Sequence, residues 1–244
     1  MKSIILAAGY ATRLYPLTEN QPKPLLPVAG KPMLNYIMEK IEEVSDIDEV
    51  FVVTNNKFFL TFVQWKANNE DKFTKKITIV NDKTKTNEDR LGAIGDIHYV
   101  IDNMNIDEEL LVIAGDNLFE FSLAKFVDFA NGRSSLAVYD IKDKSKIVNK
   151  FGCVELDEGS KLIGFEEKPS NPKTTLASTA CYFFTKDDVE LLEKCIQENN
   201  KPDNTGDFIQ YLSEKKDVFG FVFDEKWFDI GGKEEYEEVN KIYS

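Results

Sequence analysis

The feature that most constrains this chain is its opening segment, in which a short apolar run is followed by a rigid loop. The run Ile4-Ile5-Leu6 is typical of a buried strand, and it ends at Ala7-Ala8-Gly9, where small side chains let the backbone approach a ligand closely. Residues 9–32 then contain five of the eight prolines of the chain, which fix φ and remove amide donors. We therefore expect a stiff, irregular loop directly after a core strand.

The same loop is basic in an otherwise acidic protein. It carries Arg13, Lys23 and Lys31 against the single acid Glu19, while the whole chain of 244 residues has a net charge of −13. A basic loop at the carboxyl end of the first strand of an α/β chain predicts a phosphate site. The overall charge argues against a nucleic-acid partner, and an anionic substrate would have to be met by local cations and by Mg²⁺.

Composition places the chain among ordinary globular proteins, with enough residues for one sizeable α/β domain. Cys153, Cys181 and Cys195 lack metal-ligand spacing, and we expect buried, reduced thiols. No apolar run approaches the length of a membrane span, and the N-terminal run reads as a core strand rather than a signal peptide. The expectation is a cytoplasmic protein without a membrane partner.

The order of apolar runs predicts the fold class. Strands are expected at 4–6, 50–53, 77–80 and 110–114, with helices beginning near residues 32, 58 and 92 between them, and this alternation favours a parallel sheet. From Ser134 four strand-like runs follow with few helices between them, at 136–141, 152–156, 162–167 and 177–185. We predict an α/β protein with a Rossmann-like, mostly parallel central sheet flanked by helices, and a smaller β-rich part.

The spacing of the opening loop resembles that of a known family. Gly9-Tyr10-Ala11-Thr12-Arg13-Leu14, then Pro22-Lys23-Pro24-Leu25-Leu26-Pro27-Val28 and Gly30-Lys31-Pro32-Met33, resembles the signature of the sugar-1-phosphate nucleotidylyltransferases, also called nucleoside-diphosphate-sugar pyrophosphorylases. One departure is Ala11, where many members have a second glycine. The resemblance implies a single nucleotidyltransferase domain of GT-A-like fold: residues 1–133 would bind the nucleotide, 134–185 the sugar, and 186–244 would return to the core and end in an acidic helix.

The resemblance also implies roles for residues of the loop and of the helix at residue 92. Arg13 would hold the triphosphate and the departing pyrophosphate, and Lys23 would neutralise charge near the α-phosphate. Without the resemblance, each cation would be read as a solvated loop charge. The residues that would contact the nucleotide are Leu6, Ala7, Ala8, Gly9, Thr12 and Gly92.

Two aspartates are the metal candidates, although each has an ordinary structural alternative. Asp116 follows the buried strand 110–114 in Gly115-Asp116-Asn117, which on its own could be a simple turn. Asp229 stands in Trp227-Phe228-Asp229-Ile230-Gly231, which could be a packed turn. Both resemble metal-binding positions of the family, and two carboxylates with phosphate oxygens and water suit octahedral Mg²⁺.

A third group of residues resembles the family's sugar site. Glu167 would accept hydrogen bonds from sugar hydroxyls, Lys168 would bind the sugar phosphate, and Phe151-Gly152 would support the sugar ring. Thr179 is a weaker candidate for the pocket wall. Taken without the resemblance, Glu166-Glu167-Lys168-Pro169 is a charged strand end.

The chemistry expected of these groups is attack of a sugar-1-phosphate oxygen on the α-phosphorus of a nucleoside triphosphate. A phosphate monoester with a second pKa near 6 is already dianionic at neutral pH, so no general base is needed. The catalyst has to align two anions and stabilise an in-line transition state. The only histidine, His98, has no acid or nucleophile at motif spacing, which excludes histidine-based nucleophilic chemistry.

Several substrates and one other class of function stay open at this stage. UTP or dTTP with glucose-1-phosphate is the leading pair by analogy; CTP with choline phosphate or inositol-1-phosphate, and uridylyl transfer to an amino-sugar phosphate, are alternatives. A non-catalytic relative that binds a nucleotide and regulates a partner is the second hypothesis, and a homo-oligomer is open. A dinucleotide-binding oxidoreductase is disfavoured, because the first turn is Gly-Tyr-Ala-Thr-Arg rather than Gly-x-Gly-x-x-Gly.

Overall fold

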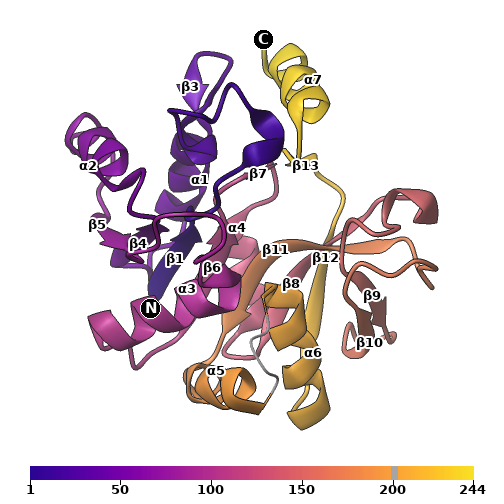
Figure 1. Cartoon of the computed structure of the whole chain (residues 1–244). Helices are drawn as coiled ribbons and strands as arrows, with labels where there is room; N and C mark the ends of the chain where they lie inside the picture. The colour runs from indigo at the N-terminus through magenta and orange to yellow at the C-terminus, as the bar shows by residue number, and fades with distance from the viewer. Residues whose placement is uncertain (199–202) are drawn as a thin grey trace.

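One nine-stranded sheet runs through both halves of the chain (Figure 1). The computed structural model describes residues 1–198 and 203–244. Along the main path the strands follow the order β10-β9-β11-β6-β1-β4-β5, and β8 pairs with β11 and β12 beside this path. The strands are β1 (Lys2–Leu6), β4 (Glu49–Thr54), β5 (Lys76–Asn81), β6 (Leu110–Ala114), β8 (Ser135–Asp140), β9 (Cys153–Leu156), β10 (Leu162–Glu166), β11 (Leu176–Phe184) and β12 (Phe219–Phe223).

The first half of the chain forms the parallel part of this sheet. β1 pairs in parallel with β4 and β6, and β4 with β5, so the predicted mostly parallel α/β sheet is confirmed. These strands are apolar on both faces because helices cover both sides. Ile5 belongs to the cluster that α1 (Met33–Glu42), α2 (Phe59–Ala67) and α4 (Leu123–Ala130) bury, while its neighbour Ile4 faces the opposite cluster.

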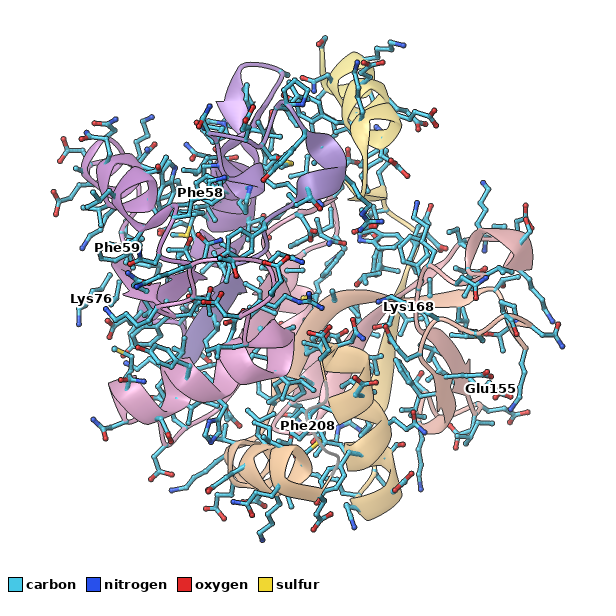
Figure 2. All side chains as sticks on the ribbon, viewed as in Figure 1. Phe58, Phe59, Lys76, Glu155, Lys168 and Phe208 are labelled. Atoms are coloured by element: carbon cyan, nitrogen blue, oxygen red, sulfur yellow. The ribbon has the colours of Figure 1, made fainter. Side chains whose placement is uncertain are left out.

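Helices from distant parts of the chain cover that opposite face. They are α3 (Gly92–Met104), α5 (Lys186–Glu198) and α6 (Thr205–Lys215), along the lower side of the view in Figure 1. Phe208 lies on the side of α6 that faces α5 (Figure 2), and its ring packs edge-on against Phe184 with centroids 5.1 Å apart. The carboxyl-terminal segment therefore completes the core of the amino-terminal half.

The β-rich segment extends the main sheet instead of forming a second one. β11 pairs antiparallel with β6 at one side, with β8 along its length and with β9 through Ala177. Its register with β8 shifts between Ser178 and Tyr182, around Ala180, whose φ of 54° is left-handed. One nine-residue strand thus joins the parallel half of the sheet to the β9–β10 hairpin.

The remaining elements are short or peripheral. Strands β7 (Asn117–Phe119) and β13 (Trp227–Asp229) form an antiparallel pair, as do β2 (Pro27–Val28) and β3 (Lys31–Pro32). Single 3₁₀ turns occur at Thr12–Leu14, Lys23–Leu25 and Lys144–Lys146, and the chain ends in the acidic helix α7 (Lys233–Tyr243). Strands of two or three residues carry too little periodicity to be predicted from sequence. Among the described helices, none is long and apolar enough to cross a membrane.

Candidate active site

A cavity of about 460 Å³ opens where the parallel strands end. Leu6 and Ala114 are register partners at the ends of β1 and β6, and Asp82 directly follows β5. The carboxyl ends of parallel strands are the usual ligand-binding edge of such a sheet. The cavity is lined by Leu6, Ala7, Ala8, Gly9, Tyr10, Ala11, Thr12, Arg13, Lys23, Pro24, Asp82, Asn87, Arg90, Gly92, Ala93, Asp96, Ala114, Asp116, Ala180, Asp203, Asn204, Thr205 and Gly231.

The structure brings the predicted nucleotide-contacting residues together in this one cavity. Leu6 to Gly9, Thr12 and Gly92 all line it, as do Arg13 and Lys23. Arg13 is exposed, and no carboxylate among the described residues forms an ion pair with it. Lys31 is different, because its Nζ lies 2.7 Å from Glu39 and 3.7 Å above the ring of Tyr36, outside the cavity. The loop therefore directs two of its three cations into the cavity.

Lys23 and Asp116 form the central ion pair of the cavity. Lys23 Nζ donates to Asp116 Oδ2 at 2.7 Å, and the residue is 8% exposed. Asp116 follows β6 after Gly115, where an added Cβ would lie 2.7 Å from the carbonyl oxygen of Leu6, so a side chain has no room there. Burial alone would raise the pKa of Asp116, but the adjacent Lys23 ammonium outweighs it and lowers that pKa below its ordinary value.

Asp229 is brought to Asp116 by the pairing of β7 with β13. In this ladder Asp229 is the register partner of Asn117. The Asn117 Nδ2 lies 2.9 Å from Asp116 Oδ1 and 3.4 Å from Asp229 Oδ1, while its Oδ1 accepts from Trp227 Nε1 at 2.7 Å. Trp227 thus fixes which way the amide points, and the amide holds the two carboxylates near each other.

This donor set fits a divalent cation. Burial raises the pKa of Asp229 to about 6, and repulsion by the nearby negative charge of Asp116 contributes to this rise. A hard cation such as Mg²⁺ prefers oxygen ligands and keeps several positions for phosphate and water. Within residues 1–198 and 203–244, no cluster of three or more metal-ligating side chains occurs, so the protein would supply only these two carboxylates.

The predicted sugar-site residues lie in three places. Glu167 is half-buried, and two glycines leave room for its carboxylate. A Cβ added to Gly206 would collide with Glu167 Oε2, and one added to Gly152 would lie 3.2 Å from the same atom. Burial raises the pKa of Glu167 above its ordinary value. Lys168 Nζ reaches Asn204 Oδ1 at 3.0 Å, beside the first turn of α6 (Figure 2). Asn204 lines the main cavity, so Lys168, which contacts it, and the neighbouring Glu167 lie at the edge of that cavity.

Phe151 and Thr179 lie away from that group. Phe151 lines a second cavity of about 560 Å³, together with Trp227 and Asp229, and its ring centroid lies 5.0 Å from that of Trp227. Thr179 does not line either cavity; it is 2% exposed, and its hydroxyl donates to the carbonyl oxygen of Ala137 at 3.0 Å. The structure therefore does not place the Thr179 side chain in the wall of either cavity. The neighbouring Ala180 lines the main cavity instead.

Comparisons with known proteins show the family of the chain. A profile of the family described as nucleotidyl transferase matches residues 2–244. The chain belongs to this family. The bifunctional protein GlmU of Methanocaldococcus jannaschii is 34% identical over 242 residues, covering 99% of this chain and 54% of the relative. A glucose-1-phosphate adenylyltransferase of Aliivibrio fischeri is 27% identical over 97% of this chain and 65% of its own. The chain spans about half of the length of several such relatives.

Solved structures show the shared fold. A UDP-glucose pyrophosphorylase in complex with UDP-glucose superposes with a TM-score of 0.82 at 22% identity, covering 99% of this chain and 97% of the other. The predicted family is therefore confirmed by the profile match, and the predicted fold by the superposed structure.

Two acids that line the cavity were not predicted from the sequence. Asp82 and Asp96 line it and are 4% and 7% exposed. Two features of the sequence could have indicated these acids. Asp82 follows a buried strand just as Asp116 does, and Asp96 stands among the inward-facing isoleucines of the helix that begins at Gly92. An acid on the buried stripe of a helix calls for a partner or a ligand.

The departure from the family signature at Ala11 leads to a first prediction. Ala11 has a φ of 48°, a left-handed conformation that costs an L-residue roughly 1–2 kcal/mol. We expect Ala11→Gly to raise the free energy of unfolding by up to about 1 kcal/mol, less than the full strain because glycine gains entropy when unfolded. Denaturant unfolding would measure it. The matched control Ala124→Gly, within helix α4, should lower stability by about 1 kcal/mol; equal effects of both would contradict the strain argument.

A second prediction concerns the pH dependence of stability at Asp96. Burial, followed by the charge of Asp82, raises the pKa of Asp96 to about 8 from 3.8. Between about pH 4 and pH 8 the folded protein therefore keeps a proton that the unfolded chain has already released. The free energy of unfolding falls as the pH rises through that window. Asp96→Asn keeps a neutral, hydrogen-bonding side chain and removes this loss.

The measurement is the melting temperature of both proteins across that window. The melting temperature of the variant should equal that of the natural protein at pH 4 and rise steadily relative to it up to pH 8. A constant offset at all pH values would show that Asp96 does not retain the proton.

Proposed function

We propose that the protein transfers a nucleotidyl group from a nucleoside triphosphate to a sugar-1-phosphate and releases pyrophosphate. The observation that carries this proposal is the Lys23–Asp116 ion pair, which lines the same cavity as Gly9 to Arg13 and lies beside the second carboxylate, Asp229. An attacking phosphate oxygen would form a bond to the α-phosphorus while the bond from that phosphorus to the β-phosphate oxygen breaks. Cations and backbone amides at one sheet edge suit a transition state with charge on phosphoryl oxygens.

The chain's own residues would act by position and charge. The backbone at Ala8 and Gly9, with no bulky side chain, would lie against the nucleotide. Lys23 would face the α-phosphate, held in place by Asp116, and the exposed Arg13 would take the triphosphate end and the leaving pyrophosphate. Mg²⁺ bound by Asp116 and Asp229 would neutralise phosphate charge. No side chain has to accept a proton, because the attacking phosphate is already ionised.

The acceptor would enter from the side of the β9–β10 hairpin. Glu167, fixed against Gly152 and Gly206, would accept hydrogen bonds from sugar hydroxyls, and Lys168 would meet the phosphate. Phe151 would present an aromatic wall on the same side as Asp229. Glucose-1-phosphate is the acceptor to test first, since glucose occurs in the names of a curated relative and of the superposed structure.

The nucleotide is less constrained by the comparisons. The names of the similar proteins include both an adenylyltransferase and a UDP-glucose pyrophosphorylase. UTP or dTTP is the choice by analogy to the family signature. CTP, with choline phosphate or inositol-1-phosphate as the acceptor, is the alternative.

The deciding experiment is pyrophosphate release with Mg²⁺ across five nucleoside triphosphates. Each of UTP, dTTP, CTP, GTP and ATP is paired with glucose-, mannose-, N-acetylglucosamine- and inositol-1-phosphate and with choline phosphate. One strong combination that EDTA abolishes is expected. Nucleotide binding by calorimetry without turnover in any combination would instead favour a non-catalytic, regulatory protein.

For the active pair we expect Lys23→Ala and Asp116→Asn each to lower kcat by at least about a hundredfold, the scale seen when one preorganised charge is removed. Lys31→Ala is the matched control, because this lysine belongs to the same loop but pairs with Glu39 outside the cavity. Its kcat should stay within about twofold of the natural protein. Turnover that survives in Lys23→Ala would refute the role given to the ion pair.

A further inference from the structure

Lys168 lies in a backbone conformation that its residue type does not favour. Its φ is 46°, in the left-handed region that an L-residue with a long side chain rarely adopts. The following residue, Pro169, also favours an extended conformation at this position. Residues other than glycine in such conformations are held there by their surroundings and gather at functional sites. The contacts that hold Lys168 therefore bear on its proposed role.

Two oxygens hold the Lys168 ammonium beside the first turn of α6 (Figure 2). Its Nζ donates to Asn204 Oδ1 at 3.0 Å and lies 3.3 Å from Glu167 Oε1. An ammonium has three hydrogens, so these two contacts leave one hydrogen over. The Lys168 side chain is 44% exposed and Asn204 lines the main cavity, so a ligand at this edge of the cavity can reach that hydrogen.

Asn204 is fixed by contacts on both sides of it in the chain. Before it, the carbonyl oxygen of Asp203 accepts from the backbone N–H of Ala93 at 2.9 Å, and the Asp203 carboxylate accepts from Arg90 at 2.7 Å. After it, helix α6 begins, and the Asn204 backbone N–H donates to Asp207 Oδ2 at 3.1 Å. The carboxamide of Asn204 therefore extends from a segment that is bound to the start of α3 and to the first turn of α6.

The Asn204 oxygen counteracts the effect of the helix on the lysine. The amino-terminal end of α6 carries partial positive charge, which disfavours a cation close to it. Glu167 compensates with a carboxylate, but its proposed role is toward the sugar hydroxyls. The Asn204 oxygen accepts from the ammonium at the helix end itself. Without this oxygen, the flexible lysine would turn toward solvent, and a ligand would have to order it again at a cost in entropy.

We propose that Asn204 is a positioning residue of the acceptor site. It holds the Lys168 ammonium at the edge of the main cavity, with one hydrogen left for the phosphate of the acceptor. The inference rests on the proposed function and adds to it a residue outside the sequence motifs from which the site was predicted. Asn204 acts on the acceptor through Lys168, so its loss should weaken acceptor binding and leave nucleotide binding unchanged.

Two substitutions at Asn204 separate this role from the capping of α6. Serine and aspartate are both favoured at the start of a helix, so both variants should keep the helix intact. The serine hydroxyl is one bond shorter than the carboxamide and does not reach Lys168, whereas the aspartate carboxylate does. With the acceptor that the natural protein uses, Asn204→Ser should raise the acceptor KM about tenfold, the effect of one lost hydrogen bond to a charged group. Asn204→Asp should keep that KM within about threefold of the natural value.

The controls show whether the effect is local to the acceptor. The calorimetric Kd of the nucleotide and the melting temperature of Asn204→Ser should match those of the natural protein. Asn103→Ser, the same exchange at an exposed position of α3, should leave the acceptor KM unchanged. Weaker nucleotide binding and a lower melting temperature in parallel with the rise in KM would indicate a structural role and would contradict the inference.

A double variant tests whether Asn204 acts through Lys168. Once Lys168→Ala has removed the ammonium, the addition of Asn204→Ser should raise the acceptor KM no further. A second rise of similar size would show that Asn204 contacts the acceptor itself and would overturn the inference.

The two proposals fail in distinguishable ways. If the natural protein binds no nucleotide or releases no pyrophosphate with any acceptor, the proposed transfer reaction fails, and the role of Asn204 fails with it. If the natural protein is active and Asn204→Ser has the natural acceptor KM, the transfer reaction stands and the inference about Asn204 is wrong.

Discussion

The arrangement of the site depends on the short antiparallel ladder between β7 and β13. This pair of three-residue strands joins the end of the central strand β6 to a segment more than a hundred residues later in the chain. It brings Asn117 opposite Asp229, and the Trp227 indole fixes the amide that contacts both carboxylates. The nearness of two like charges would be unfavourable in isolation. The ladder and the surrounding aromatic packing hold them there, which is typical of sites built for a cation.

The cavity contains both cationic and anionic side chains, although the whole chain has a net charge of −13. Arg13 and Lys23 of the loop line the cavity together with the acids Asp116, Asp82 and Asp96, and Asp229 approaches Asp116 through Asn117. A triphosphate nucleotide has the complementary pattern, with an anionic end and an uncharged aromatic end. Under the proposed function, Arg13 and Lys23 would attract the anionic end of this ligand, although the protein as a whole repels it.

The sequence was sufficient for the parts of the structure that depend on local pattern. The apolar runs predicted β1, β4, β5, β6 and the α/β class, because strands buried on both faces are continuous in sequence. Gly9, Thr12, Arg13 and Lys23 were assigned to one site through the resemblance to the family signature, and all four line one cavity. Their roles in catalysis stay predictions, as do those of Glu167 and Lys168.

Other features depend on contacts between distant segments, which no local pattern encodes. The pairing of β11 with β6, which extends the sheet, joins segments far apart in the sequence. The β7–β13 ladder does the same. Lys31 looked equivalent to Lys23 within the loop, yet Glu39 on α1 holds it outside the cavity. Asp96 was passed over because its neighbours are apolar, although an acid among inward-facing isoleucines is itself a signal.

The continuity of β11 has a mechanical consequence. Its residues hydrogen-bond to β6, which ends at the proposed nucleotide side, and to β8 and β9, which support the proposed acceptor side. The two proposed substrate regions therefore belong to one sheet, which is irregular along this strand only at the register shift around Ala180. Under the proposed function, this shared sheet would set the distance between the two reacting phosphates. Access for substrates would come from movement of side chains and loops at the rim, at rates faster than those of domain closure.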